Sequence, residues 1–374
     1  MGIRKCPLEK VVIKIIHSLI DRSYWSGKRV LVTGHTGFKG SWLTIWLKKL
    51  GCHVTGIGLA PITSPSLYEL GRVSSLCDSH FIDILNIARL NKVIKESEPQ
   101  IVFHLAAQAL VRKSYHDPLE TISTNTMGTA NVLNAIRDVP SVKTVVLITT
   151  DKVYKNNETG QAYKEEDALG GYDPYSASKA ASELIIDCFR NSYLKGAGIH
   201  IASARAGNVI GGGDWSQDRI IPDAIRAWGA NESLKIRNPQ SIRPWQHVLE
   251  PLYGYIILAQ NLEINPNFAK SYNFGPSPKD VASVKEVIAL AQKIWGGGDV
   301  EIDSNSSQFK EAGVLKLDAT LAQNELGIFP AWNTAQSIKK TINWYKNQMH
   351  GANAIDLCEK DIGKYEAALN GNEQ

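Results

Sequence analysis

Short apolar runs alternate with amphipathic stretches along the first half of the chain. Apolar runs at 29–33, 53–58, 80–83, 101–107, 144–150 and 199–206 predict buried strands. Helical periodicity is found between them, at 41–50, 90–97, 124–138 and 175–195. Strands that alternate with helices of this length are typical of a parallel sheet covered on both faces. The sequence therefore predicts an α/β fold, a Rossmann-type doubly wound parallel sheet.

This rhythm changes after Gly207, where glycines and turn residues cluster and shorter mixed elements follow. We expect a dinucleotide-binding domain over 24–206 and a smaller, mixed α/β substrate-binding domain over 207–374, some segments of which return to the first domain. Residues 1–23 form an extension whose apolar positions recur at helical spacing. An amphipathic helix packed on the body or on a partner subunit is favoured there, and a membrane-surface helix is the alternative.

Composition narrows the class of protein. The 374 residues carry a net charge of only +4 without a basic block, which argues against nucleic acid as a partner. The 5 cysteines are widely separated and form no CxxC pair, so neither a metal site nor a disulfide framework is expected. This pattern fits a reducing, cytoplasmic location. No apolar run approaches the roughly 20 residues that a membrane-spanning helix needs.

A glycine-rich loop follows the first predicted strand. Gly34, Gly37 and Gly40 in "VLVTGHTGFKGSW" are spaced GxxGxxG and lie directly before a helix. Glycines allow a tight turn and a close approach to phosphate, and a helix N-terminus offers free N–H groups. The position of the loop in a βαβ pattern makes a dinucleotide pyrophosphate its expected ligand.

The choice between NAD and NADP stays open from these residues. The second strand ends in "GIGLAP", with neither an acid for a ribose hydroxyl nor an arginine for a 2′-phosphate. His35 and Lys39 lie within the loop and could meet phosphate charge. Asp83 could accept a hydrogen bond from the adenine amino group, or it could cap the following helix.

Tyr175 and Lys179 in "YSASK" stand four residues apart and therefore share one face of the last predicted helix. A nearby ammonium favours the phenolate form of tyrosine. Such a tyrosine can take the proton of a substrate hydroxyl while hydride leaves the same carbon. The pair predicts an oxidation site beside the glycine loop.

The order of these motifs resembles the extended short-chain dehydrogenase/reductases from Tyr24 to the C-terminus. The segments are "TGHTGFKG", "HLAAQ", "NTMGTANVL", "TTDKVY" and "YSASK". Within that superfamily, "ARAGNVIGGGDW" and "RPWQHVLEPL" resemble the CDP-glucose 4,6-dehydratase family. The resemblance implies NAD as cofactor and a set of cofactor-binding residues: Gly34, His35, Thr36, Gly37, Phe38, Lys39, Gly40, Asp83, Ile84, Leu105, Ala106, Ala107, Tyr175 and Lys179.

The resemblance also implies roles for "TTDKVY". Thr150 would hydrogen-bond the C4 oxygen of a hexose, Asp151 would be the acid for water loss, and Lys152 the base at C5. Lysine in place of the more common glutamate points to the CDP-linked branch, and it works as a base only when neutral. Asp151 and Lys152 could instead be surface charges, because adjacent residues of a regular strand point to opposite faces.

Substrate-binding positions are implied in the same way, and they are Gln108, Asn208, Arg219, Lys235, Arg237, Arg243 and Asn273. Arg243 is the best candidate for the pyrophosphate of the nucleotide sugar. A homodimer is implied through the helices that start near Met127 and Tyr175. Two alternatives remain: a nucleotide-sugar 4-epimerase, which would not need Asp151 and Lys152, and a cofactor-binding regulator without catalysis.

Overall fold

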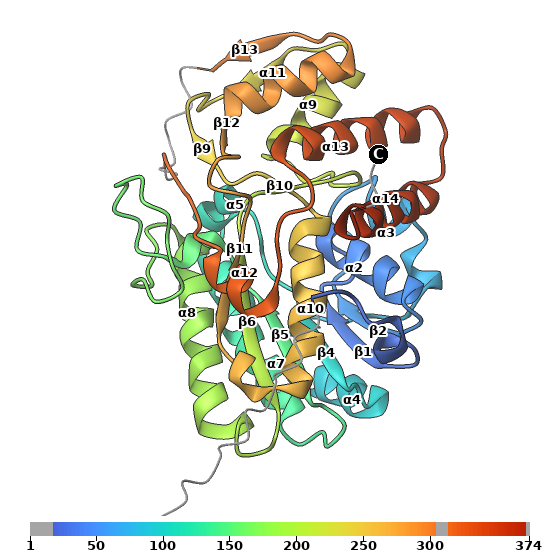
Figure 1. Cartoon of the computed structure of the whole chain (residues 1–374), viewed down its shortest axis with the longest axis vertical. Coiled ribbons are helices and arrows are strands. Elements are labelled where there is room, and N and C mark those ends of the chain that lie inside the picture. The colour runs from blue at the N-terminus through green and yellow to red at the C-terminus, as the bar shows by residue number, and fades with distance from the viewer. Residues whose placement is uncertain (1–17, 304–312, 372–374) are drawn as a thin grey trace, which may run out of the picture.

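The computed structural model describes residues 18–303 and 313–371, and it is built around a seven-stranded sheet (Figure 1). All neighbouring strands are parallel, in the order β11-β6-β5-β4-β1-β2-β3. The strands are β1 (Arg29–Thr33), β2 (His53–Gly58), β3 (Asp78–Phe81), β4 (Ile101–His104), β5 (Thr144–Ile148), β6 (His200–Ala206) and β11 (Ser271–Phe274). The predicted doubly wound parallel sheet is confirmed.

Helices cover both faces of the sheet. One face carries α2 (Phe38–Lys49) and α10 (Leu249–Ile264), and the other carries α4 (Ile87–Ser97), α7 (Gly128–Ile136) and α8 (Pro174–Phe189). Successive strand residues alternate between the two cores. In β5, for example, Val145 and Leu147 lie in one core and Val146 and Ile148 in the other. Both faces are therefore apolar, which is why the strands read as continuous apolar runs.

Two predicted helices are longer or less regular than expected. The segment predicted at 124–138 begins earlier, with α6 (Pro118–Ile122) and the π-helical turn η2 (Ser123–Met127), and then continues into α7. The helix α8 ends in a second π-helical turn, η4 (Arg190–Leu194).

The carboxyl ends of β1 and β4 mark the point where the strand order reverses. The chain continues from β1 in one direction to β2 and β3, and from β4 in the other direction to β5, β6 and β11. Ligands of open α/β sheets bind in the crevice at such a point. The glycine loop after β1 and residues 105–107 after β4 both lie there.

The second half of the chain contributes to both parts of the molecule. Strand β11 joins the large sheet and α10 packs on it, while α14 (Ala354–Leu369) packs on α2. The smaller mixed region lies above the carboxyl ends of the strands, at the top of Figure 1. It contains β7 (Val209–Ile210), α9 (Ile220–Gly229), β8 (Leu234–Ile236), β9 (Ile242–Arg243), β10 (Gln246–His247), β12 (Ala282–Ser283), α11 (Val284–Trp295), β13 (Val300–Ile302) and α13 (Thr334–Met349).

The remaining short elements connect these layers. They are α1 (Arg22–Trp25), α3 (Leu67–Leu70), η1 (Val73–Ser75), α5 (Val111–His116), η3 (Asp151–Val153), η5 (Pro266–Phe268) and α12 (Thr320–Leu326). The helix expected within residues 1–23 lies mostly outside the described residues. Within residues 18–303 and 313–371, no helix has the length and apolar character to cross a bilayer, and no cluster of potential metal ligands occurs.

Candidate active site

A pocket of about 530 Å³ runs along the carboxyl ends of the strands. Its walls come from the glycine loop, the ends of β4 and β5, the start of α8 and the region from Ala206 to Val284. It thus joins the predicted cofactor loop, the smaller region and four of the predicted catalytic residues in one cavity, namely Thr150, Lys152, Tyr175 and Lys179.

The glycine loop forms a cradle that admits no side chain at two positions. Gly34 has φ +77°, and a Cβ there would lie 2.7 Å from the Ala106 backbone nitrogen. A Cβ on Gly40 would lie 2.0 Å from the Gly34 carbonyl oxygen. Gly37 caps α2 without a side-chain hydrogen bond, so the first turn of the helix is open to a ligand in the pocket. This geometry fits a pyrophosphate.

Most predicted cofactor residues line the pocket, namely Gly34, Thr36, Gly37, Phe38, Lys39, Gly40, Asp83, Ile84, Leu105, Ala106, Ala107, Tyr175 and Lys179. His35 does not; it is buried beneath the loop, where Nε2 lies 2.7 Å from the Ser79 hydroxyl. Burial lowers the pKa of His35 to about 4, so its ring is neutral near pH 7 and offers no positive charge to a phosphate. Asp83 is not the cap of the next helix, because Asn86 caps α4.

The chain leaves strand geometry directly after β5. Residues Asp151–Val153 form the 3₁₀ turn η3, whose N-cap is Thr150. The Thr150 hydroxyl donates to Asp151 Oδ1 at 2.9 Å, and Lys152 Nζ donates to the same oxygen at 3.1 Å. Asp151 and Lys152 therefore do not point to opposite faces of a strand, because the turn brings the carboxylate and the amine together. Thr150 and Lys152 line the pocket, while Asp151 is fully buried and its Oδ2 has no partner.

Tyr175 and Lys179 are presented by the first two turns of α8. Asp173 caps this helix by accepting from the Ser176 backbone N–H, which sets the start of the helix at the pocket. Lys179 Nζ donates to the Ile148 carbonyl at 2.9 Å, so it is tied to the end of β5. Burial raises the pKa of Tyr175 to about 12, and the hydrogen bond between Tyr175 and Thr150 acts to lower it. Burial lowers the pKa of Lys179 to about 8, and the negative charge of Glu183 acts to raise it.

Lys39 was expected only as a charge in the phosphate loop. Its ammonium lies 5.9 Å from the centre of the Tyr255 ring, on α10, and it is electrostatically coupled to Asp151 and Lys152. Burial lowers the pKa of Lys39 to about 7, and the cation of Arg219 lowers it further. A glycine-loop residue thus belongs to the charge cluster of the reacting groups, which spacing alone did not indicate.

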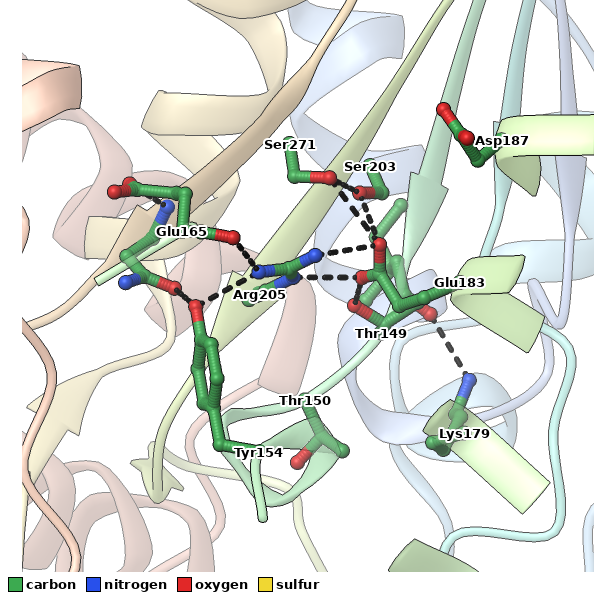
Figure 2. A network of polar contacts seen from close by, with 12 residues as sticks. Thr149, Thr150, Tyr154, Glu165, Lys179, Glu183, Asp187, Ser203, Arg205 and Ser271 are labelled. Carbon is green, nitrogen blue, oxygen red and sulfur yellow. Dashed lines mark hydrogen bonds and ion pairs between the residues drawn. The ribbon is translucent and has the colours of Figure 1, made fainter. Parts of the chain in front are cut away.

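A buried polar network lies behind the catalytic residues (Figure 2). Its centre is the ion pair between Glu183 of α8 and Arg205 of β6, at 3.0 Å. Neither residue was among those predicted from the sequence. Glu183 follows Lys179 by one helical turn, so the same spacing that paired Tyr175 with Lys179 could have indicated it.

Besides Gln108, five predicted substrate residues line the pocket: Asn208, Arg219, Lys235, Arg237 and Arg243. The buried Oδ1 of Asn208 has no partner and is available to a ligand. Arg219 donates to Asp214 at 3.1 Å, and Arg237 donates to Asp218 at 2.8 Å. Carboxylates therefore already hold the guanidinium groups of these two arginines in place at the pocket.

Two other predicted substrate residues have structural partners instead. Asn273 is fully buried outside the pocket and bonds to Tyr154 and to the carbonyls of Tyr163 and Asp318, so its contact with substrate stays a prediction. Gln108 reaches the pocket wall, but its amide bonds to Leu110 and to Thr121. Its function there is to hold the loop after β4.

Comparisons with known proteins identify similar sequences and similar folds. The sequence pattern of the GDP-mannose 4,6 dehydratase family matches residues 31–341. CDP-glucose 4,6-dehydratase of Salmonella typhimurium is 45% identical over 94% of this chain and 99% of the relative. The solved structure of dTDP-glucose 4,6-dehydratase from Bacillus anthracis with NAD has a TM-score of 0.73 and 20% identity, covering 88% of this chain and 100% of that one. UDP-glucuronic acid 4-epimerase from Bacillus cereus, with UDP-glucuronic acid and NAD, has a TM-score of 0.74 and 23% identity, covering 85% and 99%.

Proposed function

This chain belongs to the GDP-mannose 4,6-dehydratase family, and we propose that it dehydrates CDP-glucose to CDP-4-dehydro-6-deoxyglucose with NAD as cofactor. The observation that carries the proposal is the contact between Asp151 and Lys152 beside Thr150 and Tyr175. An oxidation of a hydroxyl needs only the tyrosine, the lysine of its helix and a hydrogen-bond donor. An elimination needs an acid and a base in addition.

The cofactor would be held by residues that fit it. The Gly34 and Gly40 positions tolerate no side chain, the open N-terminus of α2 suits a pyrophosphate, and the apolar residues after β2 and β4 suit the rings. When bound, NAD supplies a hydride acceptor that later returns the hydride. The absence of an acid after β2 leaves the ribose without its usual partner, and Asp83 lines the pocket nearby.

Oxidation at C4 is assigned to Tyr175, Lys179 and Thr150. Tyr175 takes the C4 hydroxyl proton, Thr150 donates to the same oxygen, and the ammonium of Lys179 favours the phenolate. Burial opposes this ionisation, since it raises the pKa of Tyr175 to about 12. The cation of Arg219 acts in the opposite direction, and we assign the ammonium of Lys179, one turn away, the role of favouring the phenolate during the reaction.

Elimination is assigned to Asp151 and Lys152. The C4 ketone acidifies the C5 proton, Lys152 takes that proton, and Asp151 protonates the departing C6 hydroxyl, which leaves as water. Lys152 then returns its proton to C5 when hydride is added at C6. At that point Tyr175 has gained the C4 hydroxyl proton and Asp151 has lost one, so release of a proton from Tyr175 to solvent and uptake of one by Asp151 would complete the cycle. The two groups need one proton between them at the start, on Asp151. The 3.1 Å contact allows that proton to move between carboxylate and amine within the pair.

The nucleotide half would occupy the side of the pocket formed by the smaller region. The guanidinium groups of Arg243 and Arg219 would bind the diphosphate, and Lys235 and Arg237 would flank the base. The preference for cytosine rests on the 45% identical relative rather than on a particular contact.

We also propose a homodimer and a cytoplasmic location. Large apolar side chains are exposed on α6, η2 and α8, which pack side by side; Leu119 is 77% and Leu184 is 62% exposed. Pairing of these helices with their copies would bury both faces.

The reaction is tested by incubating the protein and NAD with CDP-glucose, and separately with UDP-, dTDP- and GDP-glucose, and measuring product masses. Loss of one water from CDP-glucose supports the proposal. Loss from another nucleotide sugar keeps the mechanism and changes the substrate. An unchanged mass with an altered C4 stereocentre supports the epimerase. No conversion of any of the sugars supports the non-catalytic regulator.

A further inference from the structure

One buried ion pair fixes both ends of the segment that carries the reacting groups. This catalytic turn, residues 149–154, contains Thr150, Asp151 and Lys152. Figure 2 shows Glu183 and Arg205 between its first residue and its last. The two residues come from α8 and β6, so the turn is tied to the helix that carries Tyr175 and Lys179.

Glu183 holds the beginning of the turn. Its Oε1 accepts from the Thr149 hydroxyl at 2.5 Å, and its Oε2 accepts from the Ser203 hydroxyl at 2.7 Å and the Ser271 hydroxyl at 3.2 Å. The carboxylate therefore joins α8 to the residue that follows β5 and to β6 and β11. Glu183, Ser203 and Ser271 lie outside the pocket, and Thr149 lies at its wall.

Arg205 holds the end of the turn. Its Nε and Nη2 donate to the two oxygens of Glu183, each at 3.0 Å, and its Nη1 donates to the Tyr154 hydroxyl at 2.9 Å and the Glu165 carbonyl at 3.0 Å. Tyr154 then donates to Asn273 Oδ1 at 2.6 Å. This bidentate geometry leaves little freedom to either end of the turn.

The pair also contributes charge. Both side chains are at most 4% exposed, so their fields are weakly screened. The charge of Glu183 raises the pKa of Lys179, opposing the burial that lowers it to about 8. The cation of Arg205 and the hydrogen bonds keep Glu183 ionised, because together they lower its pKa in spite of burial.

We propose that Glu183 and Arg205 are positioning residues, which clamp the catalytic turn at Thr149 and Tyr154 and hold Lys179 as the cation that Tyr175 requires. Neither residue lines the pocket, so both act through other residues. This inference rests on the proposed function for its kinetic readouts. Its structural readout, the rigidity of residues 149–154, does not depend on any activity.

Two substitutions separate the two effects of the clamp. Tyr154→Phe removes the hydroxyl at the far end and leaves every charge in place. We expect kcat to fall by roughly 10- to 100-fold with little change in KM, and the pH profile to stay where it is. Glu183→Gln keeps the shape and removes the charge. We expect a similar loss of kcat, and a shift of the alkaline limb of the profile to lower pH by about one unit.

Hydrogen exchange measured by mass spectrometry gives the activity-independent test. The Lys152 amide donates to Thr150 Oγ1 and the Val153 amide to the Thr150 carbonyl. Exchange in the peptide over 149–154 should accelerate in both variants, while peptides of β2 and α14 stay unchanged. Glu250→Gln is the matched control, a buried carboxylate outside the pocket, and it should leave the alkaline limb and this peptide as in the wild type.

If the amides of 149–154 exchange at the wild-type rate in both variants, the proposal that Glu183 and Arg205 clamp this turn is wrong, whatever the kinetic constants of the variants. Faster exchange there together with a wild-type alkaline limb in Glu183→Gln overturns the charge effect on Lys179. Wild-type protein that converts no nucleotide sugar overturns the proposed function, and the exchange results then still decide on the clamp. Should Glu183→Gln fail to fold, Tyr154→Phe decides the positioning role alone.

Discussion

Replacing Asp151 with asparagine separates the two halves of the proposed reaction. Asparagine has the same shape, and its side-chain carbonyl can still accept from the Thr150 hydroxyl, which now donates at 2.9 Å. What is lost is the proton for the C6 hydroxyl. Tyr175, Lys179 and Lys152 are untouched, so oxidation at C4 and proton removal at C5 should continue.

The expected loss follows from the burial of Asp151. General acid catalysis contributes about 10²- to 10⁴-fold, which equals about 3–5 kcal/mol of transition-state stabilisation. Asp151 is fully buried, so bulk water does not readily take its place as the acid. We therefore expect dehydration to fall toward the upper end of this range, by about 10³-fold or more.

The assay is run in D₂O with CDP-glucose, and both product mass and deuterium at C5 of the recovered sugar are measured. The Asp151→Asn variant should return undehydrated sugar that has gained deuterium at C5, because Lys152 still exchanges that proton. Lys152→Met should return sugar without deuterium. Asp187→Asn, an exposed aspartate on the same helix as Tyr175, is the control and should match the wild type.

Two results would refute the reasoning. Unchanged dehydration by Asp151→Asn would remove the acid assignment. Loss of C5 exchange together with dehydration in that variant would mean that Asp151 acts before the elimination, through the positions of Thr150 or Lys152 rather than as the acid.

Three further predictions use other parts of the structure. Burial raises the pKa of Glu250 to about 7, so near pH 6 the folded protein holds a proton that the unfolded chain releases. The free energy of unfolding should therefore fall by up to about 3 kcal/mol as the pH rises from about 4.5 to 7, and urea titrations of Glu250→Gln should lack this pH dependence. Gly40→Ala places a Cβ against the Gly34 carbonyl and should weaken NAD binding at least 100-fold in calorimetry. Leu184→Asp puts a charge on the exposed face of α8 and should yield a monomer in light scattering, while a dimer of unchanged affinity would exclude that face.

Local patterns in the chain predicted the backbone well. Apolar runs of strand length predicted every strand of the sheet except β11, because both faces of the sheet are covered and its central strands β4 and β5 are wholly buried. The spacing of Gly34, Gly37 and Gly40 indicated the loop, and the four-residue spacing of Tyr175 and Lys179 placed them on one helical face. These features depend on neighbours within one or two turns, which a sequence displays directly.

Other features depended on segments that lie far apart in the chain. Asn273 is recognisable as a substrate position by motif, yet Tyr154, 119 residues earlier, and backbone carbonyls of two other segments use its side chain. Lys39 belongs to a loop motif, but its ammonium lies 5.9 Å from the Tyr255 ring of α10, and the charges of Asp151 and Lys152 affect its pKa. Neither outcome is encoded in local spacing.

The sequence by itself determined which residue types this protein brings to its pocket and which backbone elements carry them. The tertiary structure alone decided how their charges meet. Asp151 and Lys152 share a site because the chain turns into η3 at the end of β5, and the ion pair of Glu183 and Arg205 holds that turn. The physical reason is that hydrogen bonds within helices and turns are local, whereas the burial and the pairing of charges are set by whichever distant segments pack around them.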